Sequence, residues 1–299
     1  MANNRVKLWA GLGAAAFAAG TASPAAANAD NVPAERDATP GAIQLANGGG
    51  EGGEGGEGGT ALPDAQKNLY RVLFLESHLR IAEQLIDTGD ARQGRKHVRH
   101  IVEHLDGHIG EELRGHGFET DDVADAAEEL SDRIEDGAAS AALREQGYRV
   151  RHVIDTLKQH VPAHAQHHPD PVMSVATALL RKAGAEYDAA VEDGEVVNLA
   201  EYQDARGFVW TARDLVGSAG AALHARNADT YAALLDSFAT LMDAFPSPSG
   251  PSVSPTEPGA VSAAISRIEL RMSSLYTDGR PVAEGGEGGE GGEGGEGSH

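Results

Sequence analysis

Two blocks of glycine and glutamate limit the part of the chain that can fold to the stretch between them. "GGGEGGEGGEGG" covers residues 48–59, and "EGGEGGEGGEGGEG" covers residues 284–297. Glycine at this density cannot bury apolar surface or hold one backbone conformation, so we expect disordered segments at 30–61 and 281–299. A packed core must therefore form within about residues 62–278.

The charge of the chain favours cations as partners. Its formal net charge is -22 with neutral histidines, which argues against nucleic acid or an anionic membrane surface as a partner. The glycine–glutamate blocks fit solubilising linkers. Their spaced carboxylates also fit a cation trap. Such a trap would bind weakly, because ordering flexible chain around each ion costs entropy. The sequence contains no cysteine, so any metal must be held by nitrogen and oxygen ligands.

Residues 1–29 have the pattern of a secretory signal peptide. Arg5 and Lys7 precede the short apolar run "LWAGLGAAAFAAG", and residues 27–29 form a small-x-small cleavage pattern. We expect cleavage before Asp30 and a periplasmic or secreted mature protein. The apolar run is too short for a convincing membrane span, and we expect no membrane span after its removal.

Between the glycine–glutamate blocks, the apolar residues repeat with the period of an α-helix. The pattern predicts about eight helices in two sets of four and no convincing strand. Short loops between antiparallel neighbours favour up-and-down bundles. We therefore expect an all-α fold of two four-helix-bundle-like units: a His-rich bundle at 62–161, a linker at 162–171 and a second bundle at 172–280. A helical solenoid is the alternative architecture.

One predicted helix, from about Ala91 to Leu113, carries a row of polar residues beside its apolar stripe. At about 100° per residue, that row consists of His97, His100, His104, His108 and Glu111. Imidazoles one turn apart can clamp a divalent metal such as zinc, copper or iron, and a carboxylate can complete the shell. The alternative is a solvated, pH-responsive histidine face.

His78 lies near the middle of the apolar arc of the preceding predicted helix. A buried structural histidine is the usual alternative to a ligand at such a position. A bundle, however, places facing side chains of neighbouring helices around one inner site. We therefore predict a divalent metal site (iron, copper or zinc) with the ligands His78, His97, His100, His104, His108, Glu103 and Glu111. A second histidine group is expected to be solvated or to bind metal loosely: His152, His160, His164, His167 and His168.

Residues 179–209, "LLRKAGAEYDAAVEDGEVVNLAEYQDARGFV", resemble the extracytoplasmic helical segment of high-affinity iron permeases. The likeness rests on the run "YDAAV", on the turn at Gly194 and on the pair Glu201-Tyr202. The permease's membrane helices and its glutamate-rich membrane motif are not seen in this sequence. The resemblance implies a related module associated with iron or another metal, with Glu186 and Glu201 in supporting roles and a membrane metal-transport component as partner.

Residues 76–105 resemble an uncharacterised group of bacterial periplasmic helical proteins. In that group a Gly-His-Leu helix precedes a His-x-x-His helix, and His78, His97 and His100 match this pattern. The two resemblances together cover less than half of the chain.

These patterns lead to one main functional hypothesis and two alternatives. The main hypothesis is an exported metal-binding helical protein that handles iron, copper or zinc through the site in the first bundle. The first alternative is a helical protein–protein interaction scaffold with solvated histidines, and the second is non-covalent haem binding by a histidine pair. An enzyme is not expected, because the sequence shows no G-x-S-x-G elbow, H-E-x-x-H motif or phosphate loop.

Overall fold

A computed structural model describes residues 62–278 of the chain. Residues 1–61 and 279–299 lie outside the described part of the chain. They include the predicted signal peptide at 1–29 and the predicted disordered segments at 30–61 and 281–299. The described chain is helical apart from its loops and one small hairpin, formed by β1 (Val191–Glu192) and β2 (Glu195–Val196). The predicted all-α fold is confirmed.

The first half of the described chain contains five helices. They are α1 (Asp64–Thr88), α2 (Ala91–Asp106), α3 (His108–Gly115), α4 (Asp121–Glu135) and α5 (Ser140–His160). α1 ends because Gly89 takes the left-handed conformation with φ 91°, and the Gly89 N–H closes the helix on the carbonyl of Ile86. This turn reverses the chain and lays α2 against α1.

The predicted helix from Ala91 to Leu113 is interrupted. Gly107 is extended, with φ -98° and ψ -154°, and it separates α2 from α3. The start of α3 then lies so close to α2 that a Cβ on Gly110 would be 1.8 Å from the carbonyl oxygen of Leu105. The break changes the direction of the chain, so residues 108–113 do not continue the line of α2.

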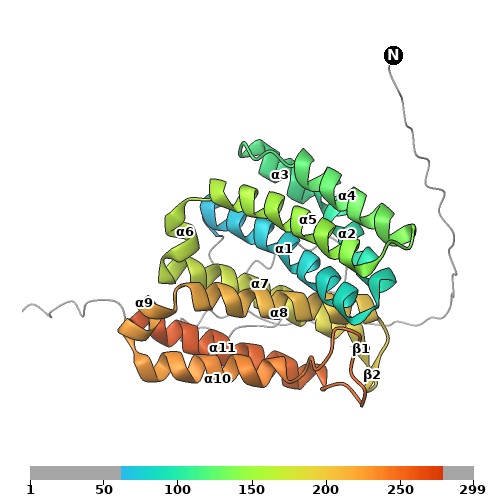
Figure 1. Cartoon of the computed structure of the whole chain (residues 1–299). Coiled ribbons are helices and arrows are strands. Elements are labelled where there is room, and N and C mark those ends of the chain that lie inside the picture. The colour runs from blue at the N-terminus through green and yellow to red at the C-terminus, as the bar shows by residue number, and fades with distance from the viewer. Residues whose placement is uncertain (1–61, 279–299) are drawn as a thin grey trace, which may run out of the picture. The chain divides into compact units, whose positions relative to one another are not determined.

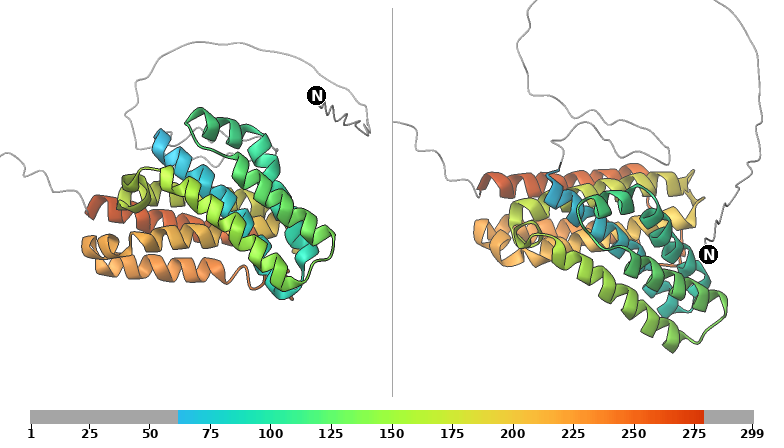
Figure 2. Two further views of the ribbon diagram at one scale, coloured as in Figure 1. Left: turned by 45° about the horizontal axis from the view of Figure 1, so that its top comes forward. Right: turned by 90° about the horizontal axis from the view of Figure 1, so that it is seen from above.

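The second half contains α6 (Ala163–His167), α7 (Pro169–Ala190), α8 (Leu199–Ser218), α9 (Gly220–Arg226), α10 (Ala228–Met242) and α11 (Pro258–Asp278). The β1–β2 hairpin connects α7 to α8, and the Asn198 side chain caps α8 by accepting from the backbone N–H groups of Ala200 and Glu201. Figure 1 shows α10 and α11 on the opposite side of α7 and α8 from α1, and Figure 2 shows the same helices from two further directions.

Helices on both sides of the predicted linker at 162–171 contribute to one hydrophobic core. α1 packs against α2 and α5 and also against α7 and α8. At the crossing of α1 and α8 a Cβ on Gly207 would lie 2.7 Å from the Ser77 carbonyl oxygen, so only glycine permits this approach. The close crossing brings side chains of α8 within reach of α1 and α2. The predicted domain boundaries stay a prediction.

Candidate metal centre

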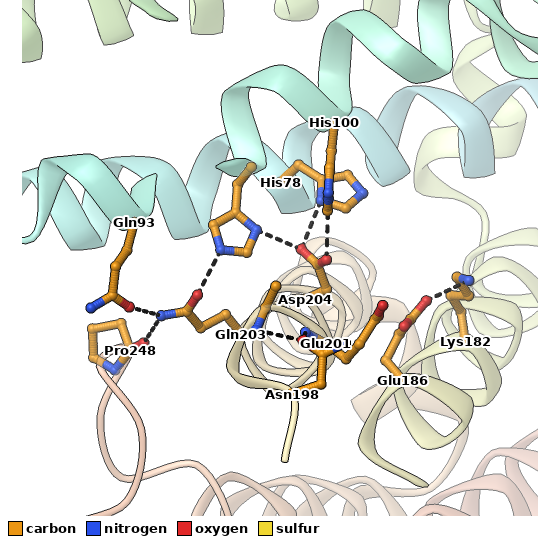
Figure 3. A network of polar contacts seen from close by, with 12 residues as sticks. His78, Gln93, His100, Lys182, Glu186, Asn198, Glu201, Gln203, Asp204 and Pro248 are labelled. Carbon is orange, nitrogen blue, oxygen red and sulfur yellow. Dashed lines mark hydrogen bonds and ion pairs between the residues drawn. The ribbon is translucent and has the colours of Figure 1, made fainter. Parts of the chain in front are cut away.

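Four polar side chains meet in the interior between α1, α2 and α8. His78 comes from α1, His97 and His100 come from α2, and Asp204 comes from α8. One potential ligand atom from each residue lies within 4.8 Å of the others. Within residues 62–278 this is the one group of three or more His, Asp or Glu residues with such spacing. We call these four residues the His3Asp cluster; Figure 3 shows His78 and His100 above Asp204.

Asp204 is the centre of the His3Asp cluster. Its Oδ1 lies 2.8 Å from Nδ1 of His78 and 2.8 Å from Nδ1 of His97. Its Oδ2 lies 3.4 Å from Nδ1 of His100. The Asp204 side chain is 4% exposed, against 3% for His78 and 0% for His97. A single buried carboxylate therefore faces three imidazoles.

The charges in the His3Asp cluster follow from burial and from Asp204. Burial alone raises the pKa of Asp204, but the three facing imidazoles outweigh it and hold that pKa well below its usual range. Burial also lowers the pKa of His78, against the opposing effect of Asp204. The hydrogen bond to Asp204 raises the pKa of His100 and outweighs the burial of that ring. The cluster thus combines a buried anion with imidazole nitrogens, which is an environment that attracts a cation.

His104 lies beside the His3Asp cluster. Its ring centroid is 5.4 Å from that of His78 and 6.3 Å from that of His100. The ring also packs edge-on against Phe74, with centroids 4.7 Å apart. Burial, with smaller contributions from His78 and His100, lowers the pKa of His104 to about 4. His104 is therefore neutral at pH 7 and forms one wall of the cluster.

The remaining predicted ligands are not brought into the cluster. Glu103 is on α2 but is exposed. His108 lies on α3 with a side chain that is 56% exposed, and its Nε2 is 3.7 Å from Glu112. Glu111 is also exposed on α3. The prediction of one row of ligands assumed one straight helix. The break between α2 and α3 separates His108 and Glu111 from the histidines of α2.

The second histidine group does not form a comparable cluster among the described residues. His164 and His168 place their ring centroids 4.5 Å apart at the ends of α6. Nδ1 of His160 donates to the backbone carbonyl of Thr156, 2.9 Å away in its own helix.

Comparison with known proteins gives a match for the second half of the described chain, which contains Asp204. Residues 162–278 match the iron permease-associated 4-helix bundle domain. The match runs from α6 to α11 and includes residues 179–209, so the predicted resemblance to the iron permease helical segment is confirmed. No curated protein and no solved structure matches the chain significantly.

The matched segment, residues 162–278, supplies Asp204, which is the cluster residue that the sequence pattern did not predict. The three histidines lie before this domain, so the cluster joins it to the helices that precede it. A signal was present in the sequence. Asp204 lies in a run of residues that α8 buries, between Tyr202 and Phe208. An aspartate among buried positions is rare unless it is paired, and it therefore marks a partner.

The matched segment also places a pair of glutamates next to the cluster. Glu201, one turn before Asp204 on α8, is hydrogen-bonded to Glu186 of α7. That hydrogen bond, followed by burial, raises the pKa of Glu201 to about 8. Glu201 therefore keeps its proton at neutral pH. Glu186 also pairs with Lys182, as Figure 3 shows. These are the two glutamates for which the resemblance implied supporting roles.

Within residues 62–278 no helix is long and apolar enough to cross a membrane.

Proposed function

We propose that this protein is exported and binds a divalent metal ion in the His3Asp cluster, as part of iron handling. The observation that carries the proposal is the buried, ionised Asp204 that faces His78, His97 and His100 within one cluster. Three imidazole nitrogens and one carboxylate form a donor set that suits iron, copper and zinc. The match to an iron permease-associated domain favours iron among these three metals.

Three further features support the setting of this function. The signal-peptide pattern of residues 1–29 supports a periplasmic or secreted protein. The name of the matched domain supports a membrane metal-transport component as the partner that gives or receives the ion. The net charge of -22 favours the approach of cations.

Metal binding would rearrange the hydrogen bonds of the cluster. The ligand atoms are spread over distances of up to 4.8 Å, whereas the ligands of a tetrahedral ion with bonds of about 2.0 Å lie roughly 3.3 Å apart. The side chains therefore move inward when an ion binds. The protons between Asp204 and the histidines must leave at the same time, so binding releases protons and strengthens as pH rises.

The test is calorimetry on the chain purified without an affinity tag and stripped of metal. We expect the parent protein to bind one Fe²⁺ or Zn²⁺ ion, and Asp204→Asn and the double variant His78→Ala/His97→Ala to lose that binding. His108→Ala is the matched control, because it removes an exposed histidine outside the cluster, and it should bind as the parent does.

A parent protein and an Asp204→Asn variant with equal affinity for both ions would refute the proposal. An interaction scaffold would then account for the fold. In that case a partner would co-purify with the protein whether or not a chelator is present.

A further inference from the structure

The ring nitrogen of His97 that faces away from Asp204 is held by a chain of amide groups. Nε2 of His97 lies 2.9 Å from Oε1 of Gln203. The side-chain nitrogen of Gln203 lies 2.7 Å from the carbonyl oxygen of Pro248 and 3.0 Å from Oε1 of Gln93. His97 is 0% exposed and Gln203 is 1% exposed. Figure 3 shows the contacts of Gln203 with Gln93 and Pro248.

The contact with Pro248 fixes the orientation of the Gln203 amide. A backbone carbonyl oxygen can only accept a hydrogen bond, so the atom that faces it must be the NH₂ group of Gln203. The Gln203 oxygen is therefore the atom that faces His97. An amide oxygen also only accepts, so Nε2 of His97 must carry a hydrogen and donate it.

This hydrogen bond decides which nitrogen of His97 can bind a cation. A ring nitrogen that keeps its hydrogen cannot bind a metal, so the nitrogen of His97 left for a cation is Nδ1, once it gives up the hydrogen that it donates to Asp204. Nδ1 is also the nitrogen that lies 2.8 Å from Asp204 Oδ1 inside the cluster. Two consecutive residues of α8, Gln203 and Asp204, thus hold the two nitrogens of one buried ring.

His78 provides a contrast. Its Nδ1 also lies 2.8 Å from Asp204 Oδ1. Its Nε2, however, is buried without a hydrogen-bond partner among residues 62–278. No outer contact therefore holds a hydrogen on Nε2 of His78, whereas Gln203 does so for His97.

We infer that Gln203 is a positioning residue, which holds His97 with hydrogen on Nε2 and thereby makes Nδ1 the metal ligand. The inference rests on the proposed metal-binding function. Outer partners of this kind orient the ring of a metal-binding histidine, and their loss typically lowers metal affinity about 10–100-fold. Gln93 and Pro248 act through Gln203 by fixing its amide.

The first test reads the tautomer directly and needs no metal. Long-range proton–nitrogen NMR correlations of the histidine rings in the metal-free parent protein should show His97 with hydrogen on Nε2. In Gln203→Met, which has a side chain of similar size and no amide acceptor, the fraction of His97 with hydrogen on Nε2 should fall. An unprotonated Nε2 in the parent protein would overturn the inference.

The second test measures Zn²⁺ affinity by calorimetry. We expect Gln203→Met to bind Zn²⁺ about 10–100-fold more weakly than the parent. Gln203→Glu keeps an oxygen acceptor for Nε2 and should bind more tightly than Gln203→Met. Gln93→Met removes only the outermost contact and should have the smallest effect. Circular dichroism of each metal-free variant checks that the fold is retained.

The outcomes separate this inference from the proposed function. If the parent protein binds Zn²⁺, Asp204→Asn does not, and Gln203→Met binds as tightly as the parent, the positioning role is overturned and the metal site stands. If the parent protein fails to bind Zn²⁺ and Fe²⁺, the proposed function is overturned, and the role of Gln203 falls with it.

Discussion

At the scale of single residues, the candidate centre depends on one buried negative charge. Moving a carboxylate out of water costs several kcal/mol unless partners compensate it. The partners of Asp204 are imidazoles, and burial lowers the pKa of one of them, His78. Asp204 therefore stays ionised at neutral pH. A divalent cation bound in the cluster would replace the compensation that the imidazoles supply in the metal-free protein.

The Glu201–Glu186 pair predicts a pH dependence of stability. The pKa of Glu201 is raised from 4.5 to about 8 in the folded protein, so the folded state binds this proton more tightly than the unfolded state does. Its contribution to stability is therefore complete below pH 4.5 and is lost as pH rises through about 8. Glu201→Gln keeps a hydrogen-bond donor toward Glu186 and cannot ionise.

We expect the stability of Glu201→Gln relative to the parent to increase between about pH 5 and about pH 9, because only the parent loses the contribution of the Glu201 proton. Urea unfolding of the two metal-free proteins at several pH values measures this difference. Two parallel pH profiles would show that the Glu201 proton is not linked to folding.

At the scale of secondary structure elements, α8 carries the features that build the centre. It supplies Asp204 to the cluster and Gln203 to the amide chain, and it crosses α1 at Gly207. A side chain at Gly207 would meet the backbone of α1, which is unable to give way as a flexible side chain does. The distance between α8 and the histidines is therefore set by this glycine.

Gly207→Ala tests the crossing of α1 and α8. Its Cβ would lie 2.7 Å from the Ser77 carbonyl oxygen, so the helices must separate, at a cost of about 1–3 kcal/mol in the free energy of unfolding. Gly217→Ala on the same helix is the matched control. Nothing lies within 4 Å of a Cβ at Gly217, and alanine there should be neutral or stabilising by up to about 1 kcal/mol.

Urea unfolding gives the stability of both glycine variants, and calorimetry with Zn²⁺ gives their metal affinity. We expect Gly207→Ala to lower the affinity as well as the stability, because it moves Asp204 away from α1. Equal stability of the two variants would mean that the helices cross with more room than the structure shows.

Some elements of the site could be predicted from the sequence, and others could not. Helical periodicity is a local property, and it places His78 in the apolar arc of α1 and His97 and His100 on one side of α2. The contribution of Asp204 depends on which helix packs against α1, and that pairing follows from tertiary contacts such as the one at Gly207. The break at Gly107 was also missed, because a single glycine within a helical pattern is usually tolerated.

At the scale of the whole molecule, the candidate centre lies where the two halves of the described chain share their core. α1 and α2 come from the first half, and α8 belongs to the matched domain at 162–278. The buried residues of both halves form one continuous cluster. An ion bound between them would therefore stabilise both halves together.

This arrangement predicts a single unfolding transition that metal shifts as a whole. Zn²⁺ at a free concentration 100 times its Kd should raise the free energy of unfolding by about 2.7 kcal/mol. Fluorescence of Trp210, the one tryptophan within residues 62–278, reports on α8, and far-UV circular dichroism reports on all helices. The two transitions should coincide with and without Zn²⁺. Separate transitions would show that the halves unfold independently.

The separation of the ligands along the chain has a consequence for the order of events in the cell. His78 and Asp204 are 126 positions apart, so the four donors come together only after α1, α2 and α8 have packed. A polypeptide threaded through a translocation pore in extended form has no such arrangement. If the protein is exported unfolded, it crosses without cargo, and the ion that it acquires comes from the compartment in which it folds.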